Sequence, residues 1–172
     1  MDKKVSGTEI CSIHCGSKCC KSTRPALTSR DIERINNFTD LKNWFIKIGI
    51  NSDKAYVISK KENSNDCIFL SEKNLCVIYE NRPFDCRLFP LFIQIKEENE
   101  TTFVAKWLVW YCPLTDAKGI EKLRIESKSH VENILSKSME EIFEYQKAMV
   151  LSNGYKKKHF LMEERLKMIK EN

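Results

Sequence analysis

The 172-residue chain is poor in glycine, proline and histidine, with five, four and three residues respectively. Its glycines form neither a G-x-G-x-x-G pattern nor a P-loop, so the standard cradles for dinucleotides and phosphates are missing. The G-x-S-x-G and H-E-x-x-H signatures of serine hydrolases and zinc proteases are missing as well. These motifs therefore assign no catalytic or cofactor-binding residue.

Long hydrophobic runs are also missing. The longest apolar stretches, "FVAKWLVWY" and "YQKAMVL", are interrupted and much shorter than the roughly 18 residues that span a membrane. The N-terminal "MDKKVSGTEI" has no apolar segment of the kind that follows the basic residues of a secretory signal. We therefore expect a cytoplasmic protein that has no membrane partner.

A strong charge of one sign is lacking too. The chain has 29 basic and 24 acidic residues, and its net charge of +5 is spread along the sequence apart from "YKKKH" at 155–159. A nucleic-acid-binding protein usually has a stronger basic stripe, so we do not expect a nucleic-acid partner. The hydrophobic fraction of 42% and the length are ordinary for one globular domain covering residues 1–172.

Cysteine is the residue that the chain has in excess. The eight cysteines are Cys11, Cys15, Cys19, Cys20, Cys67, Cys76, Cys86 and Cys112. They divide the chain into a cysteine-rich part, residues 11–116, and a cysteine-free extension, residues 117–172. In a reducing cytosol such clusters bind metal or do redox chemistry more often than they form structural disulfides. Metal binding, reversible disulfides and merely buried thiols remain the three alternatives.

Local patterns predict an α+β fold, with short helices and β-hairpins in a metal-stapled, cysteine-rich domain and helices after it. Thr28 or Ser29 can cap a helix that runs through residue 35, and a second helix is predicted from Thr39 to Gly49. Strands are predicted at 55–59, at 67–70 and 75–79 around a four-residue turn, and in a hairpin formed by 91–99 and 101–112. The extension is predicted to be helical, with a capping box at Ser138 and Glu141, a stop at 153–154 and a last basic helix over 155–170.

The segment 67–90 has the pattern of a metal site. Alternation of side chains along two strands would direct Cys67 and Cys76 to the same face. Cys86 lies between two prolines that stiffen its backbone, Pro83 and Pro90. The neighbouring Arg82 and Arg87 can supply hydrogen bonds and positive charge to a thiolate centre, or can pair with surface carboxylates.

Spacing alone does not select the metal. Cys11-x3-Cys15 and Cys15-x3-Cys19 fit the range of zinc ribbons, and four thiolates also hold iron–sulfur clusters. Soft sulfur ligands suit zinc, iron–sulfur or copper(I) and disfavour magnesium and calcium. Eight sulfurs can form two sites, or one site with spare thiols. His14 can replace a thiolate or lie in an exposed loop, and His130 and His159 are assigned no role.

Four stretches in order, "CGSKCC" (15–20), "CIFL" (67–70), "CVIYENRPFDCRLFP" (76–90) and "CPL" (112–114), resemble the YkgJ-like CxxCxxCC family of zinc- or iron-chelating proteins. The resemblance covers residues 11–114. It implies seven chelators, namely Cys15, Cys19, Cys20, Cys67, Cys76, Cys86 and Cys112, whereas Cys11 lies one residue farther from Cys15 than the usual C-x-x-C. Tyr79, Arg82, Pro83, Arg87 and Pro90 match the motif as well, and Leu114 replaces a customary glycine.

Flagellin lysine N-methylases carry a related cysteine pattern, which suggests by analogy an iron–sulfur enzyme of protein methyl transfer or redox chemistry. We predict a cytoplasmic protein that binds zinc or iron, with an iron–sulfur cluster as one form, through all eight cysteines. Tyr79, Arg82 and Arg87 are predicted to surround the ligands. The alternatives are the iron–sulfur enzyme and a metal or redox sensor or chaperone.

Overall fold

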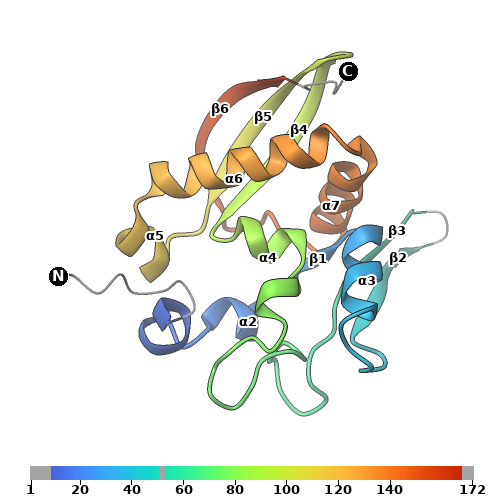
Figure 1. Ribbon diagram of the computed structural model, residues 1–172, viewed down its shortest axis with the longest axis vertical. Coiled ribbons are helices and arrows are strands. Elements are labelled where there is room, and N and C mark those ends of the chain that lie inside the picture. The colour runs from blue at the N-terminus through green and yellow to red at the C-terminus, as the bar shows by residue number, and fades with distance from the viewer. Residues whose placement is uncertain (1–8, 51–52, 168–172) are drawn as a thin grey trace.

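The computed structural model describes residues 9–50 and 53–167. Its helices and antiparallel sheets confirm the predicted α+β class (Figure 1). Along the chain the elements are η1 (Ile10–His14), α2 (Lys18–Ser22), β1 (Ala26–Leu27), α3 (Ser29–Asn36), β2 (Phe45–Ile50), β3 (Asp53–Ile58), η2 (Tyr79–Asn81), α4 (Phe84–Leu88), β4 (Leu91–Asn99), β5 (Thr102–Val109), α5 (Pro113–Lys118), α6 (Ile120–Leu135), α7 (Met139–Leu151) and β6 (His159–Lys167).

The strands form two three-stranded sheets, with the orders β1-β3-β2 and β4-β5-β6. The predicted strand at 55–59 is part of β3, and the predicted long hairpin is β4 and β5. Helix α7 packs against β1 and β3 of the first sheet and against β4 of the second, so it joins the two sheets. Helix α6 runs along the second sheet, and α4 lies near the centre of the molecule (Figure 1).

The helix predicted over Thr39–Gly49 is wrong, because residues 45–50 form β2. The apolar positions have helical spacing, but "FIKIGI" is also rich in β-branched isoleucine, and its backbone pairs with β3 along the whole strand. Trp44, just before β2, is buried without that helix: it is 1% exposed and donates a hydrogen bond from Nε1 to Asn36 Oδ1 at 3.0 Å. Tertiary pairing therefore overrides the local helical pattern.

The basic helix predicted over 155–170 is also wrong, because His159–Lys167 forms β6; residues 168–170 of that prediction lie outside the described residues. Strand β5 would be an edge strand without it, and its free backbone groups pair with β6 from Thr102↔Lys167 to Val109↔His159. Leu166 is fully buried opposite Phe103. The extension after residue 116 thus completes a sheet as well as providing helices.

The predicted helix starts and stops are mostly confirmed. Thr28 caps α3 in a capping box with Asp31. Ser138 is the N-cap of α7, so the predicted start is confirmed, but the predicted capping box with Glu141 is wrong: the Ser138 side chain makes no capping hydrogen bond within the described structure, and Glu141 instead accepts from Thr28 Oγ1. Helix α7 ends at Leu151, and Asn153 adopts a left-handed φ of 56° in the predicted stop.

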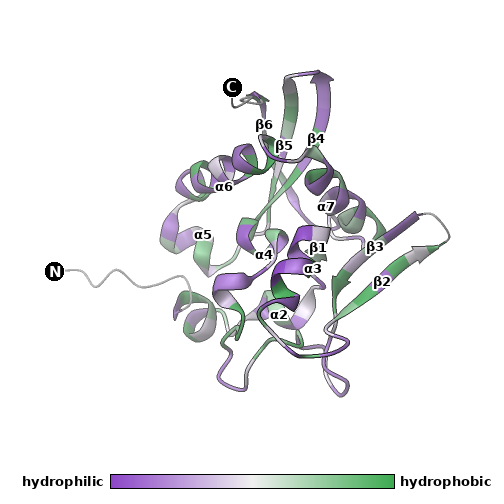
Figure 2. Cartoon of the chain, turned by 45° about the vertical axis from the view of Figure 1, so that its right-hand side comes forward, coloured by the Kyte–Doolittle hydropathy of each residue, from purple (hydrophilic) through white to green (hydrophobic). Residues whose placement is uncertain are grey.

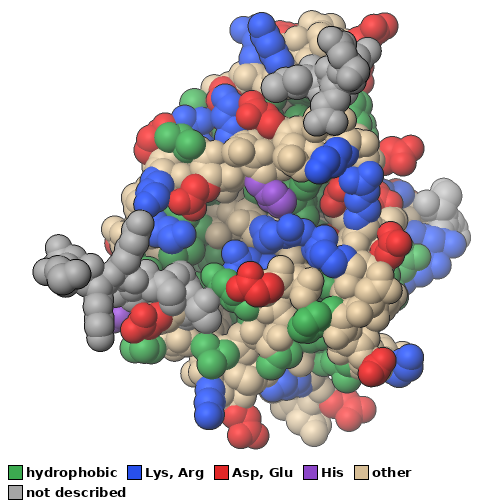
Figure 3. Space-filling model, viewed as in Figure 1, with side chains coloured by type: hydrophobic (Ala, Val, Ile, Leu, Met, Phe, Trp, Pro, Cys, Tyr) green, Lys and Arg blue, Asp and Glu red, His purple; other side chains and the backbone are tan. Residues whose placement is uncertain are grey.

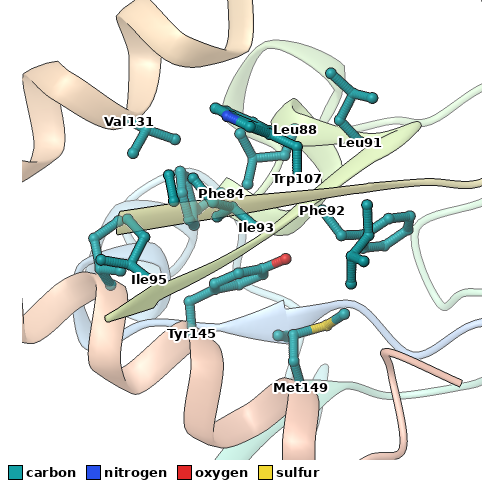
Figure 4. Packing of buried hydrophobic residues seen from close by; sticks show 14 of the residues in the cluster. Phe84, Leu88, Leu91, Phe92, Ile93, Ile95, Trp107, Val131, Tyr145 and Met149 are labelled. Atoms are coloured by element: carbon teal, nitrogen blue, oxygen red, sulfur yellow. The ribbon is translucent and has the colours of Figure 1, made fainter. Parts of the chain in front are cut away.

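Two hydrophobic cores support these elements. The larger core lies between the β4-β5-β6 sheet and the helices α4, α6 and α7, and it includes Phe84, Trp107, Val131 and Tyr145 (Figure 4). Figure 2 shows that the far end of the β4–β5 hairpin is hydrophilic, in keeping with the exposed residues 96–100. The smaller core packs under the loop that follows β3; its members are Leu27, Ile35, Trp44, Ile58, Cys67, Phe69, Leu70 and Ile78.

Asp31 connects α3 with α4. Its carboxylate is fully buried and accepts hydrogen bonds from the backbone amides of Thr28 at 3.2 Å and of Phe84 at 3.1 Å. The Arg34 guanidinium lies 2.6 Å from Oδ1 of the same group. The buried charge is therefore compensated by donors from both helices, which fixes their relative position.

Replacing Asp31 by alanine should lower the free energy of unfolding by about 3 kcal/mol, because two buried amides and one guanidinium lose their acceptor. Urea denaturation followed by circular dichroism measures the change. The matched control is Asp40→Ala, which removes an exposed carboxylate and should change stability by less than about 0.5 kcal/mol. Equal stability of the two variants would contradict the connecting role of Asp31.

Candidate metal centre

The eight cysteines come from five separate segments of the chain. Their positions are Cys11 in η1 and Cys15 at its end, Cys19 and Cys20 in α2, Cys67 and Cys76 in the loop after β3, Cys86 in α4, and Cys112 directly before α5. All eight lie in the described part of the chain and all are free thiols. Seven of them are partly exposed, whereas Cys67 is buried, with 6% of its surface exposed.

The segment that carries the first four cysteines turns sharply between η1 and α2. Gly16 and Ser17 both adopt left-handed backbone angles there, with φ of 58° and 53°; the glycine does so without steric cost. Ser17 Oγ donates to the Asn74 carbonyl at 2.8 Å, and the Cys67 amide donates to the Cys20 carbonyl at 2.7 Å. These two contacts hold α2 against the loop of Cys67 and Cys76.

The predicted pair of strands at 67–70 and 75–79 is wrong. In this described part of the chain the structure has only isolated bridges, at Lys60↔Cys67 and Leu70↔Cys76. The short turn that joins Leu70 to Cys76 is closed by the Ser71 amide, which donates to the Leu75 carbonyl at 2.8 Å. The apolar side chains here enter the smaller core rather than alternating along a ladder. Cys67 is part of that core and Cys76 packs against it, so the loop still brings these two cysteines together.

One set of thiols interacts around the smaller core. The pKa of Cys67 is raised to about 12, mainly by burial and in smaller part by the nearby Cys20 and Cys76 thiolates. Burial likewise raises the pKa of Cys86 well above its ordinary value, and charge on Asp85, Cys20, Cys67 and Cys76 adds to the effect. Cys20, Cys67, Cys76 and Cys86 are therefore close enough to repel one another when ionised.

A second set interacts beside α5, which contacts η1. Burial raises the pKa of Cys11 to about 11, and repulsion by Cys15, Cys112 and Cys20 contributes to the rise. Burial also raises the pKa of Cys112, whereas hydrogen bonds from backbone amides at the start of α5 lower it. Cys112 packs against the larger core, so this set lies against different structure from the first.

Cys19 lies between the two sets. Its Sγ is 4.0 Å from Cys20 Sγ, and it is within electrostatic reach of both Cys86 and Cys11. Either sulfur can donate in the hydrogen bond between them; this bond and the Lys60 ammonium lower the pKa of Cys20 to about 7, against the raising effect of burial. The Cys20 thiol is thus the one in this pair that ionises more readily, because a neighbouring donor stabilises its thiolate.

The thiols fit a soft metal by their chemistry. Within residues 9–50 and 53–167, no three His, Cys, Asp or Glu side chains converge on a single point as a ligand set. The donor type of the thiols nevertheless suits zinc, iron or copper(I), which accept thiolate ligands.

The three side chains expected around the ligands differ in placement. The Arg82 guanidinium stacks on the Tyr79 ring with Cζ 3.9 Å from the centroid. Arg82 also opposes the effect of burial on the pKa values of Cys11 and Cys76, so it lies near both thiols. Arg87 instead directs its Nη2 toward Asp31 Oδ1, at 3.8 Å. His14 is exposed in η1.

Sequence reasoning missed Arg34 and His130. Both lie near Arg82 and Arg87, although the four positions are separated by up to 96 residues. Burial lowers the pKa of His130 to about 4, and the positive charges of Arg87, Arg34 and Arg82 contribute. Neither residue belongs to a motif with recognisable spacing, so folding alone brings them together.

The His130 imidazole should therefore titrate near pH 4 in the folded protein. The unfolded chain has a His pKa of 6.5 and binds more protons between these values, so stability should decrease as pH falls from 6.5 to 4. Heteronuclear NMR titration of the imidazole measures the pKa. Arg87→Gln should raise it, whereas Arg165→Gln, which removes a 71% exposed guanidinium on β6, should leave it unchanged. A folded-state pKa at or above 6.5 would contradict the arrangement.

Comparisons with known proteins bear on the same cysteine-bearing part of the chain. A curated relative, an uncharacterized protein of Methanocaldococcus jannaschii, is 30% identical over 113 residues, which are 64% of this chain and 60% of that protein. No solved structure matches the chain. No helix of the described residues is long and apolar enough to cross a membrane.

The model of one protein family matches residues 10–113, a range that contains all eight cysteines and ends just after Cys112. The family is described as a "Putative zinc- or iron-chelating domain". The match extends over more than half of the chain and includes both sets of interacting thiols. The chain therefore belongs to the CxxCxxCC family.

Proposed function

We propose that this protein binds zinc or iron through its cysteine thiolates and that the metal fastens the N-terminal segment, the loop after β3, α4 and the start of α5 to one another. The observation that carries the proposal is the gathering of eight free thiols from five segments. Each of these thiols lies within electrostatic reach of at least one other, as given above. The family description supports zinc or iron as the ion.

Physical chemistry favours a cation at this place. Buried thiols with raised pKa values stay protonated at neutral pH, and a bound metal ion reverses this by stabilising the thiolate directly. Zinc and iron accept sulfur ligands, and eight thiols provide two full sets of four. Each set of four thiolates around a divalent ion carries a net charge of about −2. Lys60, which donates to the Cys20 carbonyl at 3.1 Å, and Arg82 lie where they offset part of it.

The ligands divide into two groups. We assign Cys20, Cys67, Cys76 and Cys86 to a core group, because Cys86 interacts with the other three and those three lie in or against the smaller core. We assign Cys11, Cys15, Cys19 and Cys112 to an arm group, because η1 contacts α5 and Cys11 is within reach of Cys15 and Cys112. Cys19 joins the arm group through Cys11 and lies beside the core group through Cys20.

The same thiols suit either discrete metal ions or an iron–sulfur cluster, and colour distinguishes them. Protein purified under anaerobic conditions should contain zinc or iron in at least stoichiometric amount. A colourless protein with zinc identifies discrete ions, and a brown protein with sulfide identifies a cluster. The iron–sulfur form would leave room for methyl transfer or redox chemistry, and the discrete form points to a structural or sensing role.

Removal of one thiol from each group tests the proposal. Cys76→Ser and Cys112→Ser should each reduce the bound metal by about half, because each empties one group, and the double variant should bind almost none. Mass-spectrometric metal analysis after gel filtration gives the ratio of metal to protein. The matched control is Val77→Ser, a substitution of an exposed neighbour of Cys76 that is 58% exposed and should retain the full amount.

Cysteine variants with the full metal content of Val77→Ser would contradict chelation by thiolates. Loss of all metal from either single variant would contradict the division into two groups but would agree with a single shared centre. Circular dichroism of each variant shows whether the loss of metal is accompanied by loss of the fold, as expected where metal binding contributes to folding.

A further inference from the structure

Four nitrogen-bearing side chains gather beside the cysteines without forming part of either thiol group. Arg34 comes from α3, Arg82 from the end of η2, Arg87 from α4, and His130 from α6. The Phe84 ring lies 5.4 Å from the His130 ring, which brings α6 close to α4 at this point. Figure 3 shows basic side chains side by side next to a histidine near the middle of this face, with an acidic side chain directly below them and others scattered farther away.

The cluster has more positive than negative charge. Asp31 is its buried carboxylate, and the same Oδ1 lies 2.6 Å from Arg34 Nη2 and 3.8 Å from Arg87 Nη2. Arg82 stacks on Tyr79 and forms no ion pair with a carboxylate in the described part of the chain. One carboxylate therefore pairs with two of the three guanidinium groups, and a surplus of positive charge remains.

The neighbouring carboxylate does not remove this surplus. Glu141 interacts with Arg87 only over a longer range. Its Oε2 lies 3.5 Å from Arg30 Nη1, so the charges of Glu141 and Arg30 offset each other. Burial is the main cause of the lowered pKa of His130, and the remaining positive charge lowers that pKa as well. An imidazole that stays neutral adds no further charge at neutral pH.

Four polar nitrogens in this cluster are shielded from solvent. Within residues 9–50 and 53–167, no hydrogen-bond partner lies at Nε of Arg34, Arg82 or Arg87, or at Nε2 of His130. Native proteins leave few buried polar atoms unpaired, so four in one place indicate a site that an additional acceptor completes.

A cavity gives access to the cluster. Arg82, Arg87 and His130 line a cavity of about 1130 Å³, which also reaches Cys11 and Cys86. Nine Lys and Arg residues line this cavity, but among the described residues only two acidic ones do, Asp85 and Glu126. Its size is that of a pocket for a small molecule. A guanidinium fork matches phosphate and carboxylate oxygens in pairs.

We propose that Arg34, Arg82, Arg87 and His130 form a binding site for the phosphate group of a small molecule. The nine Lys and Arg residues that line the cavity against two acidic ones favour phosphate over carboxylate, because a phosphate group carries about two negative charges at neutral pH and a carboxylate only one. The site itself uses no thiol, although the same cavity is also lined by thiols of the proposed metal centre and Arg82 lies near Cys11 and Cys76. The group can belong to free phosphate or to a phosphate ester, and both present the same oxygens to the arginines.

Isothermal titration calorimetry of the full chain with its bound metal tests the proposal. Inorganic phosphate at pH 7.5 and constant ionic strength should bind saturably at one site per chain, and acetate should bind at least about tenfold more weakly. Arg82→Gln and Arg87→Gln should each weaken phosphate binding at least about tenfold, because each removes a charged donor. The control Arg165→Gln removes the same charge from the exposed β6 and should change the affinity less than twofold.

A second measurement uses the unmodified chain and so does not depend on the folding of a variant. Phosphate should shift the NMR signals of the His130 imidazole, and chloride at the same ionic strength should not. Glycerol phosphate binding more tightly than inorganic phosphate assigns a phosphate ester, and the reverse order assigns the free ion. The proposal is overturned if phosphate gives no saturable binding, if Arg165→Gln weakens it as much as Arg87→Gln, or if the arginine variants lose metal while phosphate affinity stays constant.

Discussion

Eight thiols gather in this protein, and each lies within electrostatic reach of at least one other. Burial raises the pKa values of Cys11, Cys67, Cys86 and Cys112, and neighbouring thiols add to the rise. The proposed soft metal ion would resolve this conflict, because it would bind thiolates directly and hold segments that are far apart in the sequence. The position of the N-terminal helices depends on the same constraint, since α2 contacts the loop of Cys67 and Cys76 through few hydrogen bonds.

The rest of the fold positions the thiols. The smaller core supports Cys67 and Cys76, and the larger core supports α4 and the start of α5. Asp31 links α3 to α4 by binding the Phe84 amide and Arg34, so it positions both Cys86 and the arginine cluster. The proposed metal site and the basic cavity therefore lie next to each other, and the same packing of helices forms both. A ligand in the cavity would lie against the same α4 that carries Cys86.

Some of this could be predicted from the sequence, and the reasons are physical. Local sequence patterns predicted the helix starts at Thr28 and Ser138 and the β4–β5 hairpin, because capping residues and strand patterns lie within a few residues of each element. Residues 45–50 and 159–167 were predicted as helices and form strands, because the partner strands β3 and β5 decide their conformation and a local pattern does not include them. The cluster of Arg34, Arg87 and His130 has no periodic or spacing signal at all. It exists only after α3, α4 and α6 have packed.

X-ray absorption spectroscopy at the zinc or iron edge tests the central claim most directly, because it reports the atoms bound to the metal in the intact protein. We predict a first shell of sulfur alone, with metal–sulfur distances of about 2.3 Å. A first shell dominated by nitrogen or oxygen at about 2.0–2.1 Å would contradict the account, since it would place the metal on groups other than the eight thiols.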